Sequence, residues 1–521
     1  MTTERMSRVD TSWLRMDNDV NLMVIVGVWM LARKVPLAAV RERLAERLLK
    51  YDRFRQKVVV DALGASWVDD DDFDITRHVK SARLERRRGQ SERAALQELC
   101  GKLAATPLDA NRPLWQFVLI EDYEGGSALL ARIHHCIADG IALISVMLSL
   151  TDGGRDPPRR RTRVADGEHH DDWLADAVLK PLTDVTVKAI GMTGSGVVRS
   201  LDALAHPGQP LLGSLDLLRS GVQILQDVAA LALLPDDSRT LLKRKGSGKK
   251  VVAWTDPLPL DAIKIVGKAL GCTINDVLLS CVAGAIGGWL RERGEDPAGK
   301  EIRAMVPVNL RPPEKAWQLG NRFGLAPLVL PIGIANPVER VYAVHARMAE
   351  MKGSYQPLLA FAILSLTGLF IKPVQDMVLG LFAKKTTAVM TNVPGPAKPL
   401  MFCGSTLRQT MFWVPASGDI GVGVSILSYA GGVQFGLITD SGLCPDPQRI
   451  IDGFGVEFEK LLLVTMMLPW AGQGDSSPLP WAFQHRPTRS RRLPRSTHKP
   501  CSRHCNCPIP PTRSAMAPNS M

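Results

Sequence analysis

Long apolar runs are missing from this 521-residue sequence. The two best candidates, residues 21–32 and 358–371, have 12 and 14 residues, whereas a membrane-spanning helix needs about 20 apolar residues in succession. The second segment reads either as a buried core helix or as an apolar helix lying in a bilayer interface. The N-terminal residues mix acidic with basic side chains and lack the apolar core of a secretory signal. We therefore expect a cytoplasmic protein.

A disulfide framework is also missing. The nine cysteines are an odd-numbered and scattered set, which is typical of a protein kept in a reducing compartment. Near the end of the chain, four potential metal ligands crowd together: Cys501, His504, Cys505 and Cys507. Because they lie within seven residues and no apolar core surrounds them, we interpret them as a fortuitous cluster and not as a zinc site.

Charge of one sign is concentrated in the tail. The formal net charge is +12, and residues 471–521 hold eight Lys or Arg against one Asp, which leaves +5 for the first 470 residues. Nine prolines in these 51 residues and no apolar periodicity predict a disordered tail. The composition, 45% hydrophobic and 22% charged, excludes a fully disordered chain, collagen and a coiled coil. Nucleic acid is not expected as a partner and stays an alternative only for the tail.

The sequence does contain two α/β halves. Strand-like and helix-like runs alternate over residues 1–151 and again over residues 249–465, which predicts two layered lobes. Residues 152–248 join them, first as a charged, turn-rich loop and then as helical pieces broken by Gly and Pro. Gly431 and Gly432 separate two strand-like runs and predict a β-hairpin.

The strongest local signal joins an apolar strand to an apolar helix. His134, His135, Asp139 and Gly140 form an HHxxxDG arrangement there. Side chains alternate across a strand, so the two histidines face opposite ways and only one can point into a reaction channel. A second histidine–aspartate group, residues 169–172, lies in the charged loop without apolar flanks. We interpret that group as solvated.

These residue types suit general base chemistry. A neutral imidazole can take the proton of an alcohol as the alcohol attacks a carbonyl group, so no nucleophilic Ser or Cys is required. Asp139 can cap the following helix or pair with an arginine, and Gly140 permits close packing. The residues alone leave open a buried histidine pair beside a helix cap. They also leave open a metal site with Asp139 as a ligand, which is disfavoured because adjacent strand residues diverge.

Further short motifs accompany HHxxxDG in order along the chain. They are VDTSWL (9–14), PLD with RPLW (107–115), TINDVL (273–278), VPVNLR (306–311), LGNRFG (319–324) and TNVPGP (391–396). With these motifs the sequence resembles the bacterial wax ester synthase/diacylglycerol acyltransferase family, which is abundant in actinobacteria. The resemblance extends to about residue 463, and several motifs in one order are far more specific than one alone.

The resemblance implies a two-lobed, chloramphenicol-acetyltransferase-like α/β fold. Each lobe would be a mixed sheet flanked by helices, and acyl-CoA would meet its acceptor in a tunnel between the lobes. His135 matches the family's catalytic base, His134 the neighbouring motif histidine, and Asp139 and Gly140 the structural end of the motif. The implied catalytic residues are His135, His134, Asp139 and Asn275, and the implied substrate-binding residues are Gly140, Asp276, Asn309, Arg311 and Asn392.

The second-lobe candidates have more than one possible task. Asn275 and Asp276 match the family's Asn-Asp pair, and Asn275 either donates a hydrogen bond to the developing oxyanion or caps its helix. Asn309, Arg311 and Asn321 are expected to support the tunnel or pair with Asp139. Asn392 precedes a rigid turn that either borders the CoA path or is plain loop structure.

The function that the resemblance implies is acyl-CoA-dependent O-acyl transfer. The products would be triacylglycerol from diacylglycerol, wax ester from a long-chain alcohol, or both, with His135 as general base and no covalent intermediate. No cofactor or metal is implied besides acyl-CoA as substrate. Apolar substrates predict peripheral contact with the plasma membrane or lipid inclusions, helped by basic residues such as 159–163. The alternatives are a condensation-type transferase with another acceptor and a weakly active lipid-binding protein of the same fold.

Overall fold

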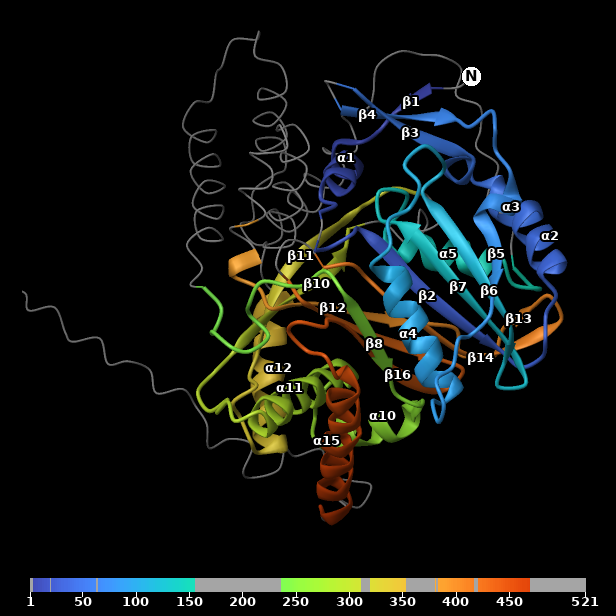
Figure 1. Ribbon diagram of the computed structural model, residues 1–521. Coiled ribbons are helices and arrows are strands. Elements are labelled where there is room, and N and C mark those ends of the chain that lie inside the picture. The colour runs from blue at the N-terminus through green and yellow to red at the C-terminus, as the bar shows by residue number, and fades with distance from the viewer. Residues whose placement is uncertain are drawn as a thin grey trace, which may run out of the picture. The chain divides into compact units, whose positions relative to one another are not determined.

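The computed structural model describes residues 3–18, 20–61, 64–154, 236–310, 319–352, 380, 383–416 and 420–468 (Figure 1). Most of the predicted charged loop and crossover, residues 358–371, Arg311 and the basic tail lie outside these described residues. The chain divides into a compact unit, Met1–Met467, and a second unit, Leu468–Met521. All described helices and strands belong to the first unit.

The first sheet is built mainly from the N-terminal half. Its six strands are β2 (Val24–Leu31), β5 (Val79–Ala82), β6 (Trp115–Tyr123), β7 (Gly126–His134), β13 (Met401–Phe402) and β14 (Ser405–Trp413). They run in the order β13-β14-β2-β7-β6-β5. All neighbours pair antiparallel except β5 with β6, which are parallel.

Both faces of this sheet are buried, as the unbroken apolar sequence of β2 requires. Val26 and Val28 point into a core that also holds Cys100 of α4 (Glu92–Ala104). Ile25 and Trp29 alternate with them and belong to the core on the opposite face. Helices α2 (Leu37–Arg47) and α5 (Gly140–Ser149) contribute their apolar residues to that second core.

A small sheet precedes these elements. It has the order β1 (Thr3–Arg5), β4 (Gly64–Asp69) and β3 (Gln56–Asp61). Helix α1 (Arg8–Arg15) follows β1 and is capped by Ser7, whose hydroxyl accepts from the Asp10 N–H. Short helical segments follow at Leu48–Lys50, Asp52–Phe54 and Ile75–His78 (α3). This arrangement places Trp13 of α1 in the core on the α5 side of the first sheet.

The second sheet is mixed. Its strands are β8 (Lys250–Trp254), β9 (Leu258–Pro259), β10 (Ile302–Asn309), β11 (Phe323–Leu330), β12 (Ala388–Pro394), β15 (Val422–Tyr429) and β16 (Gly432–Asp440). The order is β11-β10-β12-β15-β16-β8, and β9 pairs with β16. Strand β12 is parallel to β10 and β15, and the other pairs are antiparallel. The predicted hairpin between β15 and β16 is confirmed, but its turn is centred one residue earlier, at Ala430 and Gly431, which both have positive φ.

Among the described residues, the helices that accompany the second sheet are α10 (Leu260–Ala269), α11 (Ile274–Glu292), α12 (Pro337–Lys352) and α15 (Pro447–Met467). Helix α11 is buried along most of its length and contacts the other three. Arg340 of α12 reaches through this packing to pair with the buried Glu457 of α15, and its Nε donates to the Ser280 carbonyl oxygen of α11 at 2.9 Å. Gly284 of α11 gives this guanidinium room, because a Cβ there would lie 2.5 Å from it.

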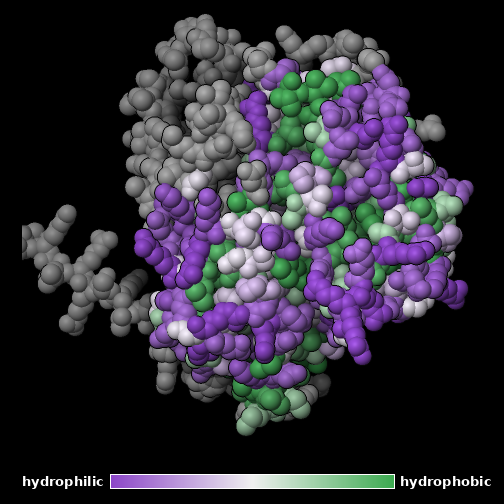
Figure 2. Space-filling view, in the orientation of Figure 1, coloured by the Kyte–Doolittle hydropathy of each residue, from purple (hydrophilic) through white to green (hydrophobic). Residues whose placement is uncertain are grey.

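The last turns of α15 expose apolar side chains. Leu463, Met466 and Met467 are 60%, 69% and 85% exposed, and Figure 2 shows the resulting apolar surface at the lower end of the molecule. Within the described ranges no single helix has both the length and the apolar composition to cross a membrane. Helices α10 and α11 meet that test only jointly, with a bend of 98° between them.

The two halves of the chain are interlocked. Strand β14 belongs to the second half of the sequence, yet it pairs with β2 from Leu407 opposite Leu31 to Trp413 opposite Val26. The predicted second lobe, residues 249–465, thus contributes two strands, β13 and β14, to the sheet of the first lobe. Close packing continues at Gly101 of α4, where a Cβ would lie 2.4 Å from the Lys250 carbonyl oxygen of β8.

Candidate active site

The HHxxxDG motif lies where β7 ends and α5 begins. His134 is the last residue of β7, and its N–H donates to the Leu114 carbonyl oxygen at 2.9 Å. The His135 N–H donates to the Met23 carbonyl oxygen at 2.7 Å. The chain then turns through Ile137, whose N–H bonds to the His134 carbonyl oxygen. Both imidazoles are buried, but their side-chain contacts are different, in line with the predicted divergence.

His134 is tied into the surrounding fold. Its Nδ1 accepts the Cys136 N–H at 3.1 Å, which requires a lone pair on Nδ1 and so places the proton of the neutral ring on Nε2. That Nε2 lies 3.4 Å from Oδ1 of Asp17. Asp17 Oδ1 also accepts the Met23 N–H at 2.5 Å. His134 therefore joins β7 to the segment before β2.

His135 has an aromatic environment. Its ring stacks on Trp13, with centroids 4.2 Å apart and planes inclined by 12°, and Phe323 of β11 approaches at 5.6 Å. The side chain is 5% exposed, and its Nδ1 has no hydrogen-bond partner among the described residues. Burial lowers the pKa of His135 to about 4. At neutral pH the imidazole is therefore uncharged and has a basic lone pair.

Asp139 closes the motif as a helix cap. Its Oδ1 accepts the Ala142 N–H at 2.9 Å in the first turn of α5, so the capping alternative from the sequence is confirmed. Its Oδ2 accepts the backbone N–H of Arg322 at 3.0 Å. The contact with an arginine that the sequence left open is thus made by a main-chain amide. One carboxylate joins α5 to the segment that precedes β11.

Asn321 anchors the segment that contains His135. Its Nδ2 donates to the His135 carbonyl oxygen and to Oδ1 of Asp10, both at 2.8 Å. Asp10 is buried in α1 beside Arg53, and burial raises its pKa although Arg53 and Asn321 lower it. Of the two alternatives for Asn321, support of the site or pairing with Asp139, the hydrogen bonds show contacts to Asp10 and to the backbone of His135.

The Asn275–Asn392 pair is a separate feature. Asn392 Nδ2, from β12, donates to Asn275 Oδ1 in the first turn of α11 at 2.7 Å. The cap of α11 is Thr273, so the alternative that Asn275 caps this helix is wrong. Among the described residues no hydrogen bond connects the asparagine pair with the histidine motif. The Oδ1 atom of Asn275 is thus occupied by Asn392.

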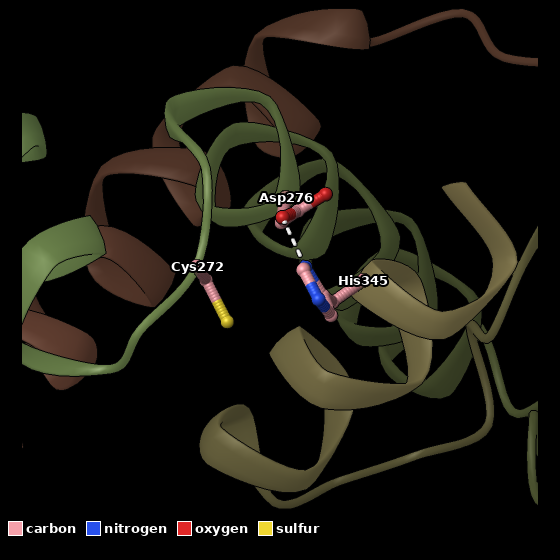
Figure 3. A group of neighbouring side chains, drawn as sticks. All are labelled: Cys272, Asp276 and His345. Atoms are coloured by element: carbon pink, nitrogen blue, oxygen red, sulfur yellow. Dashed lines mark hydrogen bonds and ion pairs between the residues drawn. The ribbon is translucent and has the colours of Figure 1, made fainter. Parts of the chain in front are cut away.

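Asp276 anchors the start of α11. Its Oδ2 accepts the Thr273 N–H at 2.8 Å in a capping box and lies 2.7 Å from Nδ1 of His345 (Figure 3). The thiol of Cys272, whose pKa burial raises to about 11, completes a group with ligand atoms within 4.8 Å of one another. Because the same carboxylate oxygen already serves the cap and His345, this group is best explained as a clamp between α11 and α12.

The remaining predicted site residues are scattered. Gly140 begins α5 and lines the large cavity described next. Asn309 is exposed at the end of β10, opposite Phe323. Arg311 lies outside the described residues. Sequence reasoning assigned no role to Trp13 or Asp10, although both belong to the VDTSWL segment that carried part of the resemblance.

An apolar cavity lies beside the motif. Its empty space is about 880 Å³, the open mouth included. Its walls come from both halves of the chain: β2 and β7, one face of α5, the 395–400 turn, β14 and the end of β15. The lining includes Gly140, the last residue of the motif, and Ile133, which directly precedes His134. The lining includes neither His134 nor His135, and its apolar side chains are suited to a hydrocarbon chain.

The two sheets, of which the first takes β13 and β14 from the second half of the chain, and the HHxxxDG motif at the end of β7 define the class: a two-lobed, chloramphenicol-acetyltransferase-like fold. The chain belongs to the wax ester synthase/diacylglycerol acyltransferase family. The model of that family's catalytic domain matches residues 6–278, and the model of its C-terminal domain matches residues 319–462. The predicted resemblance and fold class are confirmed, and the protein is an acyltransferase enzyme.

Individual relatives agree with this assignment. The probable diacylglycerol O-acyltransferase tgs1 of Mycobacterium tuberculosis is 28% identical over 430 residues, which is 81% of this chain and 87% of the relative. The corresponding tgs2 protein is 27% identical over 74% of this chain and 81% of its own length.

Solved structures show the same fold. The wax ester synthase/diacylglycerol acyltransferase from Marinobacter aquaeolei matches with a TM-score of 0.61 at 20% identity, over 89% of this chain and 100% of that one. The first condensation domain of the CDA synthetase matches at 0.52 with 15% identity, over 89% of this chain and 96% of that one.

Proposed function

We propose that the protein transfers a long-chain acyl group from acyl-CoA to the hydroxyl group of diacylglycerol, of a long-chain alcohol, or of both. The observation that carries this proposal is the neutral, buried His135 just after the end of β7, a strand whose residues Leu129, Ala131 and Ile133 line the apolar cavity. The names of the relatives support the acceptors. Acyl-CoA is a substrate, and no resident cofactor is needed for the reaction.

In the proposed mechanism His135 is the general base. Its neutral imidazole takes the proton of the acceptor hydroxyl as the hydroxyl oxygen attacks the thioester carbonyl carbon. The tetrahedral intermediate then collapses, the C–S bond breaks, and the imidazolium returns the proton to the CoA thiolate. Trp13 and Asn321 fix the ring and the backbone of His135 and so restrict the orientation of the base.

Stabilisation of the oxyanion is proposed for Asn275. Its Oδ1 is occupied by Asn392, so the side-chain N–H groups are what it can offer to a substrate oxygen. Loss of a donor of this kind typically costs about 10²- to 10³-fold in kcat. Asp139 acts indirectly in this scheme, since its capping contacts hold α5 and the loop after His135 in place.

Peripheral binding to a membrane or lipid inclusion is part of the proposal. The acceptors are lipids, and the last turns of α15 present apolar side chains at Leu463, Met466 and Met467. A basic tail follows this helix in the sequence, with eight Lys or Arg and one Asp over residues 471–521. Apolar side chains together with basic residues favour binding to an anionic lipid surface. We place the enzyme on the cytoplasmic side of such a surface.

Acyl transfer can be tested directly. Purified protein is incubated with palmitoyl-CoA and either diolein or hexadecanol, and CoA release and ester formation are measured. His135→Ala should lower kcat by about 10²- to 10⁴-fold. His78→Ala is a matched control, because His78 is also buried and stacks on a tryptophan, Trp115, at 4.4 Å. Undiminished transfer by folded His135→Ala would refute the general-base mechanism.

A further inference from the structure

The clamp between α11 and α12 brings together three side chains of the kinds that bind transition metals. Cys272 precedes α11, Asp276 belongs to the first turn of α11, and His345 lies on α12 (Figure 3). One ligand atom from each of these side chains lies within 4.8 Å of the other two. Within the described ranges this is the one group of its kind.

The donor atoms of this group match zinc. Proteins bind Zn²⁺ through thiolate sulfur, imidazole nitrogen and carboxylate oxygen, in a tetrahedron of four ligands. Ca²⁺ and Mg²⁺ prefer larger sets made of oxygen atoms. Here the set is one sulfur, one nitrogen and one oxygen, and a water molecule would complete the tetrahedron. A thiolate and a carboxylate together also balance the two positive charges of the ion.

The spacing of the side chains is close to that of a zinc site. At bond lengths of about 2.0–2.3 Å, two ligands of a tetrahedral zinc ion lie about 3.4–3.6 Å apart. His345 Nδ1 and Asp276 Oδ2 are 2.7 Å apart, so an ion would separate them by about 0.7 Å and draw the Cys272 sulfur closer by about 1.2 Å at most. The His345 side chain is 46% exposed and Cys272 is partly exposed. Both can therefore adjust, and the exposed side gives the ion a path from solvent.

The Asp276 carboxylate has the environment of a metal ligand. Asp276 is 1% exposed, and its Oδ2 accepts the Thr273 N–H at 2.8 Å, the kind of outer contact that orients a ligand. Its Oδ1 is buried and has no hydrogen-bond partner among the described residues. A buried carboxylate with an unpaired oxygen is costly unless a positive charge compensates it. A bound cation would supply that charge.

The Cys272 thiol makes only a weak contact in the fold. Its Sγ donates to the Leu270 carbonyl oxygen at 3.5 Å. Burial and the Asp276 carboxylate raise the pKa of this thiol to about 11, so without a metal the sulfur keeps its proton at neutral pH. A coordinating thiol is deprotonated by its metal ion. The S–H proton would pass to solvent as the S–Zn bond forms, and His345 would bind through the lone pair of its neutral imidazole.

We propose that Cys272, Asp276 and His345 form a zinc site that ties the start of α11 to α12, with one water molecule as the fourth ligand. The clamp is the metal-free form of this site, in which the contact between Asp276 and His345 takes the place of the ion. Because only three ligands come from the protein, zinc should bind reversibly. The site does not depend on the proposed acyl transfer.

The test measures zinc binding by the full-length protein. The tail contains another group of potential ligands, Cys501, His504, Cys505 and Cys507, so its three cysteines are first replaced by serine, and this full-length protein is called the background. After treatment with EDTA, the background is dialysed against micromolar Zn²⁺ and should take up about one ion per chain. Co²⁺ in place of Zn²⁺ should give the near-ultraviolet absorption of a cobalt–sulfur bond and the visible bands of tetrahedral cobalt.

Cys272→Ser in the background is the decisive variant. It changes a single atom and leaves the clamp intact, so in EDTA its unfolding temperature should equal that of the background. Loss of a ligand should weaken zinc binding more than loss of an outer-shell partner does, which means by more than about 100-fold, and should abolish the cobalt–sulfur absorption. His345→Ala should weaken zinc binding to a similar degree. Cys403→Ser is the matched control, because Cys403 is also partly buried, burial also raises its pKa to about 11, and it lies outside the group.

The outcomes distinguish a zinc site from a chance juxtaposition. One ion per chain in the background and in Cys403→Ser, lost in Cys272→Ser and His345→Ala, supports the site, and added Zn²⁺ should then raise the unfolding temperature of the first two proteins only. A background protein that binds no zinc overturns the proposal. Binding that is unchanged in Cys272→Ser and His345→Ala also overturns it, since the ion would then be adventitious. Acyl transfer from palmitoyl-CoA is measured separately, and its absence would count against the proposed function but not against the zinc site.

Discussion

Replacing Trp13 by leucine should change the pH dependence of the enzyme. The Trp13 ring covers one face of His135 at 4.2 Å, and burial lowers the pKa of that histidine to about 4. Leucine covers less of the imidazole and lets water reach it, which favours the protonated form. The nearby Asp139 carboxylate raises the pKa of His135, and it remains in the variant.

The shift in the pKa of His135 lies between two limits, the value of the buried side chain and the value of a fully hydrated one. Full hydration would return the pKa of His135 from about 4 to about 6.5. Protonation removes the base, so kcat/KM should stay flat from pH 8 to 5 in the wild type and fall only near pH 4. In the Trp13→Leu variant the fall should begin one to two pH units higher. At full hydration, only about a tenth of the molecules would hold a neutral His135 at pH 5.5.

The assay is kcat/KM for palmitoyl-CoA from pH 4 to 8, with CoA release as readout. Trp13→Phe keeps an aromatic ring against His135 and should keep most of the wild-type profile. Truncation of a buried tryptophan also costs stability, typically about 3–5 kcal/mol, but lower stability alone does not move the pH midpoint. A wild-type midpoint near 6.5, or identical midpoints in wild type and Trp13→Leu, would refute the reasoning.

Other residues give further predictions. Glu457→Ala leaves Arg340 buried without its partner and should lower the free energy of unfolding by about 3–5 kcal/mol in urea titrations, with a smaller loss for Glu457→Gln. Asn321→Ala removes the hydrogen bonds to His135 and Asp10; kcat should fall while KM for palmitoyl-CoA stays within twofold, and a changed KM alone would contradict this. Because the pKa of His135 is lowered on folding, its contribution to stability is complete above pH 6.5 and should decrease by about 3 kcal/mol as the pH falls to 4, measurable as the difference from His135→Gln.

Features encoded within a few residues were predictable. The strand, the two histidines, the cap at Asp139 and the start of α5 occupy residues 126–149 without interruption, so alternation and capping rules apply directly. The same holds for the β15–β16 hairpin, where the error of one residue reflects Ala430 taking a positive φ that glycine usually takes. The resemblance supplied the overall architecture, which periodicity alone leaves undetermined.

Contacts between distant segments were not predictable. Trp13 stacks on a histidine 122 positions later, and Asn321 bonds to Asp10 across 311 positions. No local pattern encodes such a pair. The cavity was also not predictable from the sequence, because its lining depends on the register of β2 with β7. A shift of one residue would turn Gly27 to the other face of the sheet. The addition of β14 to the first sheet likewise has no signal in the sequence of β14 itself.

The position of β14 means that the first sheet is completed only late in the synthesis of the chain. Until residues 405–413 have been synthesised, β2 is an unpaired edge beside a half-built cavity, and unpaired edges invite association with other chains. His135, Trp29 of the cavity lining and the segment around Asn321 come together only when most of the chain has left the ribosome. A truncated product therefore lacks the enclosed site, and the cell obtains either the whole enzyme or an inactive fragment.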